Sequence, residues 1–103
     1  MPDPASLSRA DRLREEFQKQ APHIHWHELQ TNYAHGSVIR VAPPLDLVEV
    51  AVQLGMDNTD QFQAWISAGH IAAVNDAEAR AWFETNPRLR TVVAAPWVLV
   101  QNS

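Results

Sequence analysis

The most constraining feature of the sequence is an uncharged apolar stretch near its end, residues 92–100, which reads Val-Val-Ala-Ala-Pro-Trp-Val-Leu-Val. A short run rich in valine is typical of a strand buried on both faces, and Pro96 would break a helix. Because proline cannot donate to a sheet ladder, we expect two halves of one strand with a kink or bulge at Pro96. The Ala95–Pro96 bond is expected to be trans, the commoner isomer. The stretch predicts the centre of a sheet.

Composition narrows the class of protein. A chain of 103 residues can form one domain with its own core, and the absence of cysteine excludes disulfides and thiolate metal ligands. The net charge of -4 disfavours nucleic-acid binding, which needs a concentrated basic face. Neither a secretory signal nor a run of membrane-spanning length is visible. We therefore expect a cytoplasmic domain without a membrane or nucleic-acid partner.

Amphipathic spacing predicts a first helix over residues 5–20, whose apolar face carries Leu7, Ala10, Leu13 and Phe17. The chain is thus divided into an N-terminal amphipathic helix, residues 1–21, and a single α+β domain, residues 22–103. Because the apolar face is narrow, the helix packs either on this domain or on a second copy of the chain. We expect self-association as a homodimer, and an unknown protein or small-molecule partner is left open.

The middle of the chain alternates predicted helices and short strands. Trp26, Leu29 and Tyr33 have helical spacing, and Gly36 is a suitable C-terminal cap. A strand is predicted at residues 38–42 and another at 71–74. Residues 56–59 are predicted to form a turn, in which Asn58 caps a helix that ends at Gly69, and a second capped helix is predicted at 76–85. These residues of the two helices are expected to face inward: Phe62, Trp65, Ile66, Ala79, Trp82 and Phe83.

Residues 46–55 carry two conflicting patterns. Asp46 and Glu49 form a capping box, which predicts a helix, whereas the valines at positions 48, 50 and 52 alternate as they would in a strand. We expect a helix because Asp46, Glu49 and Gln53 would then form one polar stripe on an otherwise buried cylinder.

The expected fold class is α+β. Strands are predicted at residues 38–42, 71–74 and 92–100, and the helix between the last two predicts a right-handed crossover that makes these strands parallel. The result would be a small, largely parallel three-stranded sheet packed by four to five helices.

Three histidines alternate in the sequence, His23, His25 and His27. Imidazole is a common zinc ligand, and on a strand the three rings would share one face. If Trp26 begins a helix, however, His25 and His27 diverge, and a solvated linker with a helix cap is the better interpretation. We expect no metal and no cofactor; His23 and His27 are the alternative metal ligands, because they could meet if the helix began at Pro22.

Asp46 and Glu49 lie on one face of the predicted helix, so they could also act as an acid pair. Capping and solvation of the helix explain both residues without catalysis. The second function that we consider is nevertheless a small metal-dependent or acid-base enzyme using His23, His27 and Asp46 or Glu49.

Trp97 is the aromatic residue of the central stretch. Tryptophans at such positions are more often core than ligand platform, but Trp97 could line a pocket or an interface beside Pro96. Arginines 40, 88 and 90 are candidates for an anion site, although neither a Gly-rich phosphate loop nor a nucleophile motif accompanies them. We therefore expect a non-enzymatic binding or protein-interaction module, with this functional surface: Arg40, Asp46, Glu49, Arg90 and Trp97.

Two blocks of the sequence are distinctive, Leu-Asp-Leu-Val-Glu-Val-Ala at residues 45–51 and Ala-Pro-Trp-Val-Leu-Val-Gln at residues 95–101. Together with Trp-His-Glu-Leu at residues 26–29, they resemble a family of short bacterial proteins classed as a domain of unknown function. The resemblance covers about residues 22–101. It implies no activity, substrate or cofactor.

Overall fold

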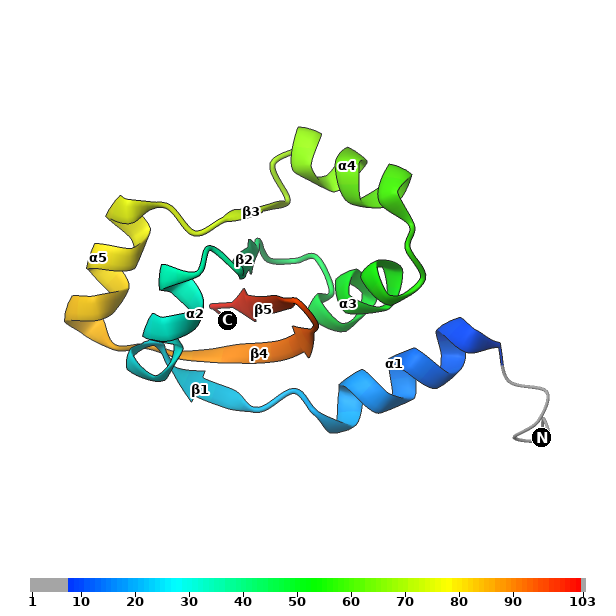
Figure 1. Ribbon diagram of the computed structural model, residues 1–103, viewed down its shortest axis with the longest axis horizontal. Helices are drawn as coiled ribbons and strands as arrows, with labels where there is room; N and C mark the ends of the chain where they lie inside the picture. Colours follow the sequence, from blue (N-terminus) through cyan, green and yellow to red (C-terminus); the bar gives the residue numbers. More distant parts are fainter. Residues whose placement is uncertain (1–7, 103) are drawn as a thin grey trace.

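The computed structural model describes residues 8–102, which form one mixed sheet and helices on both of its faces (Figure 1). The elements in chain order are α1 (Arg9–Lys19), β1 (His23–His25), the 3-10 helix η2 (Trp26–Leu29), α2 (Gln30–Ala34), β2 (Val38–Val41), α3 (Leu47–Gly55), α4 (Thr59–Ser67), β3 (Ile71–Ala73), α5 (Asp76–Thr85), β4 (Arg88–Ala94) and β5 (Trp97–Gln101). Leu7, predicted to belong to the first helix, lies outside the described residues. Within residues 8–102, every helix is too short or too polar to cross a membrane.

The sheet has five strands in the order β1-β4-β5-β2-β3. Strands β2 and β5 run parallel, whereas the β1/β4, β4/β5 and β2/β3 pairs are antiparallel. The domain is therefore α+β, but the expectation of a small, largely parallel three-stranded sheet is wrong.

The main reason is the behaviour of residues 92–100. They form two strands instead of one, because the chain reverses at Ala95 and Pro96, and β4 and β5 pair antiparallel with Val92 opposite Leu99 and Ala94 opposite Trp97. Pro96 lies in the turn, where the missing N–H removes no ladder hydrogen bond. The Ala95–Pro96 bond is cis, as is Pro43–Pro44, so the expectation of a trans bond is also wrong.

Two further strand pairings differ from the prediction. Strand β3 pairs with β2, and both β2 and β5 separate it from β4, so β3 and β4 run in the same direction, as predicted, but are not neighbours in the sheet. At the opposite edge, His23–His25 is the strand β1, paired with β4, in place of the predicted linker. The reversal and the extra edge strand together raise the number of strands from three to five.

Each face of the sheet carries its own hydrophobic cluster. On the first face, Ile39, Val92 and Leu99 of the sheet pack against α1, α3 and α4, where the buried helix residues include Leu47, Val50 and Val52. On the second face, Leu89, Val98 and Val100 pack against η2 and α5, where the buried helix residues are Trp26, Leu29 and Trp82. Figure 1 shows the two groups of helices at opposite ends of the sheet. Strand β5 lies between them, with residues buried on both faces.

Helix α3 confirms the helical interpretation of residues 46–55. The Asp46 carboxylate accepts hydrogen bonds from the backbone N–H of Val48 at 2.9 Å and of Glu49 at 3.4 Å, which satisfies the exposed donors of the first turn. Valines 48, 50 and 52 are all buried because the sheet, α1 and α4 surround the helix. The valines alternate in the sequence because the helix is buried on every side except the half-exposed stripe of Glu49 and Gln53.

The predicted caps of the next two helices are also confirmed, since Asn58 accepts from Gln61 N–H and Asn75 from Glu78 N–H. Two residues expected to face inward do not. Ile66 of α4 is 43% exposed and Phe83 of α5 is 57% exposed. Their helices contact the sheet along a narrower face than the apolar spacing predicted.

Helix α1 packs on α3 of the same chain. A Cβ at Gly55 would lie 2.9 Å from Leu13 Cδ1, so the absence of a side chain at Gly55 permits the close approach of the two helices. The guanidinium of Arg14 also donates to the Glu49 carboxylate at 3.0 Å. This hydrogen bond and the charge of Glu49 raise the pKa of Arg14 above its usual value.

A hydrogen bond joins α2 to α5. The Tyr33 hydroxyl donates to Asp76 Oδ1 at 2.6 Å. This bond, reinforced by desolvation and by the negative charge of Asp76, raises the pKa of Tyr33 above the ordinary value of 10.0.

The order of the strands predicts a gradient of amide hydrogen exchange. Amides of Leu99 and Val100 in the central strand β5 should exchange only by global unfolding, and that of Ala72 in the edge strand β3 should exchange about tenfold faster or more, through local opening. Exchange followed by NMR measures both. Equal protection of the two strands would contradict the observed sheet order.

Tyr33 can be titrated by itself, because it is the one tyrosine in the chain. Absorbance of tyrosinate should show a pKa above 10, which Asp76→Asn should bring back toward 10. Because the pKa is raised in the folded state, the stabilisation is complete below pH 10 and is lost as the pH rises through the folded pKa. The opposite shift on substitution would exclude the hydrogen bond to a carboxylate.

Candidate ligand-binding site

A groove of about 420 Å³ lies beside the turn between β4 and β5. This volume falls within the range of about 300–1,000 Å³ typical of small-molecule sites. Three parts of the chain line it: the β4–β5 turn, the turn between α3 and α4, and α1. The lining residues are Phe17, Leu54, Gly55, Asp57, Asn58, Thr59, Phe62, Val93, Ala94, Ala95, Pro96 and Trp97.

Aromatic side chains from three different elements line this groove. Trp97 begins β5 directly after the turn, Phe62 comes from α4 and Phe17 from α1. All three are half-buried, because they pack on the core cluster while leaving part of each ring open. Val93, which also lines the groove, is 60% exposed. Trp97, for which the sequence left open a place in the core, a pocket or an interface, lies beside Pro96 in the lining of this groove.

The polar edge of the groove is the turn between α3 and α4. Asp57 adopts the left-handed conformation, with φ of 55°, and its backbone N–H donates to Leu54 O. The Asn58 side chain has partners within the domain, because it accepts from Gln61 N–H and donates to Gln53 Oε1 at 2.8 Å.

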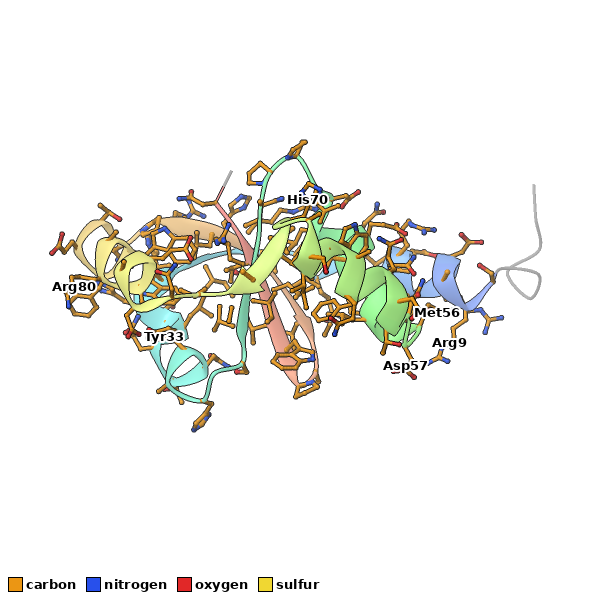
Figure 2. All side chains as sticks on the ribbon, turned by 90° about the horizontal axis from the view of Figure 1, so that it is seen from above. Arg9, Tyr33, Met56, Asp57, His70 and Arg80 are labelled. Carbon is orange, nitrogen blue, oxygen red and sulfur yellow. The ribbon has the colours of Figure 1, made fainter. Side chains whose placement is uncertain are left out.

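The Asp57 carboxylate differs from its neighbours. It is exposed, and within residues 8–102 it has neither a hydrogen-bond partner nor an ion-pair partner. Figure 2 shows Asp57 beside Met56 at the same end of the molecule as Arg9. Among residues 8–102, Asp57 is also the one ionisable residue that lines the groove.

The arginines of the predicted functional surface lie on opposite faces of the sheet. Arg40 Nε donates to the Glu78 carboxylate of α5, at 3.1 Å from Oε1 and 2.9 Å from Oε2. Arg90 is paired in register with Gln101 and so shares the face of Val92 and Leu99. The structure therefore does not bring these two arginines together as an anion site.

Asp46 and Glu49 have structural partners. Asp46 caps α3, and Glu49 binds Arg14 and accepts from Gln53 Nε2 at 3.0 Å. Of the five residues predicted as a functional surface, Trp97 is the one that lines the groove.

The histidines contact the end of α5. A carbonyl oxygen only accepts, so His25 Nδ1–H donates to Asn86 O at 3.2 Å and His27 Nε2–H donates to Phe83 O at 2.7 Å. His25 precedes η2 but makes no side-chain capping bond, contrary to the predicted cap. Among residues 8–102 no group of three or more histidine and acidic side chains could hold a metal ion.

A second hollow of about 360 Å³ is lined by Pro44, Leu45, Asp46, Trp65 and His70. Its carboxylate, Asp46, is already used as the cap of α3. The groove beside Trp97 is the better candidate site, since it combines more aromatic surface with an unpaired carboxylate.

Sequence reasoning did not identify Phe17, Asp57 or Phe62 as site residues. The two phenylalanines were assigned to the buried faces of helices, and residues 56–59 to a turn. A polar turn between two capped helices is a signal for an exposed loop, but nothing local indicates that it faces the β4–β5 turn.

The fold and groove define a small α+β domain with one candidate ligand site. The family model described as "Protein of unknown function (DUF2288)" matches residues 12–102, and the chain belongs to this family. This confirms the resemblance to a domain of unknown function. The chain is also similar to the NMR solution structure of PA1075 from Pseudomonas aeruginosa, with 33% identity, a TM-score of 0.77, and coverage of 99% of this chain and 93% of that chain. No curated protein matches the chain.

The assignment of Asp46 to a structural role can be tested by stability. Asp46→Ala should lower the free energy of unfolding by about 1 kcal/mol through loss of the cap, while Asp46→Asn should preserve it, because asparagine caps equally well. Urea denaturation measures both. Asp60→Ala, in the first turn of α4 but not at its cap, is the control. An Asp46→Ala variant as stable as the native protein would refute the capping role.

Proposed function

We propose that the protein is a non-enzymatic binding module whose ligand site is the groove between the β4–β5 turn and the α3–α4 turn. The observation that carries this proposal is the gathering of Phe17, Phe62 and Trp97, from three separate elements, around one hollow of ligand size. Half-exposed aromatic rings offer a large apolar contact area at little conformational cost, which suits recognition.

The chemistry of the lining supports binding over catalysis. Active sites for acid-base chemistry commonly combine several titratable and polar side chains around the reacting atoms, whereas Asp57 is the one ionisable side chain that residues 8–102 contribute to the lining. The alternative enzyme would use His23, His27 and Asp46 or Glu49, but the two acidic residues cap and anchor α3 while His27 binds the end of α5.

Self-association and a cytoplasmic location belong to the proposal as well. The apolar face of α1 is used against α3 of the same chain, so a homodimer would have to use another surface. Light scattering of the purified protein decides between a monomer of 11.6 kDa and a dimer.

The proposed site can be tested with a small neutral aromatic probe, 2-phenylethanol. In a titration followed by amide NMR, shifts should concentrate at residues 54–62 and 93–97. Phe62→Ala should weaken binding about tenfold, since one aromatic contact contributes roughly 1.4 kcal/mol. Ile66→Ala is the matched control, because Ile66 is an exposed apolar residue of the same helix that lies outside the groove.

Two results would contradict the proposal. One is a set of shifts centred on the second hollow at Pro44, Trp65 and His70. The other is equal weakening by the two substitutions, which would indicate nonspecific contact.

A further inference from the structure

The groove combines aromatic rings with a single negative charge. Phe17, Phe62 and Trp97 contribute the rings, and Asp57 contributes the one ionisable side chain that the described part of the chain, residues 8–102, places in the lining. The faces of aromatic rings carry negative electrostatic potential, so they attract cations, and tryptophan does so most strongly. Rings and carboxylate therefore favour the same sign of charge on a ligand.

The Asp57 carboxylate is available for such a ligand. Three acidic side chains of α1 and α3 have partners: Asp11 and Glu49 bind Arg14, and Glu15 binds Lys19. Asp60 of α4 is exposed but lies outside the lining of the groove. Asp57 has no partner within residues 8–102. Of its polar neighbours in the lining, Asn58 already accepts from Gln61 N–H and donates to Gln53 Oε1.

From these observations we infer that the groove binds a small organic cation, an ammonium group carried on an aromatic or aliphatic body. The inference rests on the proposed function and adds the chemical class of the ligand. The apolar body lies among Phe17, Phe62 and Trp97, and the ammonium group is held by the Asp57 carboxylate. The ligand thereby supplies the partner that Asp57 lacks.

One cationic side chain lies at the margin of the groove. The Arg9 guanidinium donates to the carbonyl of Gly55, a lining residue, at 3.0 Å, and this contact is exposed to solvent. Its charge opposes an ammonium ligand, although water and salt screen charges at exposed positions. Removal of the Arg9 charge therefore gives a second test of the sign of the ligand charge, because it should strengthen the binding of a cation.

The test compares three probes with the same skeleton and different charges: 2-phenylethylamine, 2-phenylethanol and phenylacetate, which are cationic, neutral and anionic at pH 7. Dissociation constants come from amide NMR titrations of the full chain at low salt. The amine should bind about tenfold more tightly than the alcohol, through the combined attraction of the carboxylate and the aromatic faces. Phenylacetate should bind most weakly.

Two charge variants test which side chains cause the preference for the amine. Asp57→Asn should reduce the preference for the amine over the alcohol to about twofold, because the asparagine side chain carries no charge. Asparagine tolerates the left-handed conformation found at position 57, so this variant should retain the fold. Asp60→Asn is the matched control, because Asp60 is a nearby exposed carboxylate outside the lining. Arg9→Gln should tighten binding of the amine.

The outcomes distinguish a failure of this inference from a failure of the proposed binding function. If none of the three probes binds the groove, the proposed function fails and the inference fails with it. If the alcohol binds at the groove as tightly as the amine, the groove is a binding site but the inference is wrong. Tighter binding of phenylacetate, lost in Arg9→Gln, would also overturn it.

Discussion

The antiparallel pairing of β4 with β5 is the interaction on which the rest of the structure depends. Because the chain doubles back at Ala95 and Pro96, its last strand enters the sheet between β4 and β2. Without β5, the sheet would separate into the two-stranded pairs β1/β4 and β2/β3, and isolated two-stranded pairs are marginal in water. Both helical groups would then lose the continuous apolar surface that they cover.

The same hairpin determines where the groove lies. Pro96 lies in the turn of this hairpin, Trp97 begins β5 directly after it, and both face the α3–α4 turn across the groove. Helix α1 completes the lining with Phe17, and α1 is held against α3 by the close approach of Leu13 to Gly55 and by the pairing of Arg14 with Glu49. The groove therefore exists only when three distant parts of the chain have folded together.

Local chemistry explains which parts of this fold could be predicted. Asp46, Asn58 and Asn75 each bond to an N–H group two or three residues ahead, so the start of a helix is encoded within a few residues. Strand pairing is not encoded in this way. Residues 92–100 have the same composition whether they form one kinked strand or two paired strands, and a proline suits both a bulge and a turn.

The sequence was also a poor guide to which charged residues would belong to the candidate site. Arg40 pairs with Glu78, which is 38 residues away in the sequence, and Glu49 pairs with Arg14, which is 35 residues away. Neither pairing is therefore visible as a local pattern. Sequence reasoning therefore selected charges that the fold uses internally. Asp57 was assigned to an ordinary turn, yet it is the carboxylate that lines the groove without a partner among residues 8–102. Among the described residues that line the groove, the charge available to a ligand is therefore the one that has no partner within the folded domain.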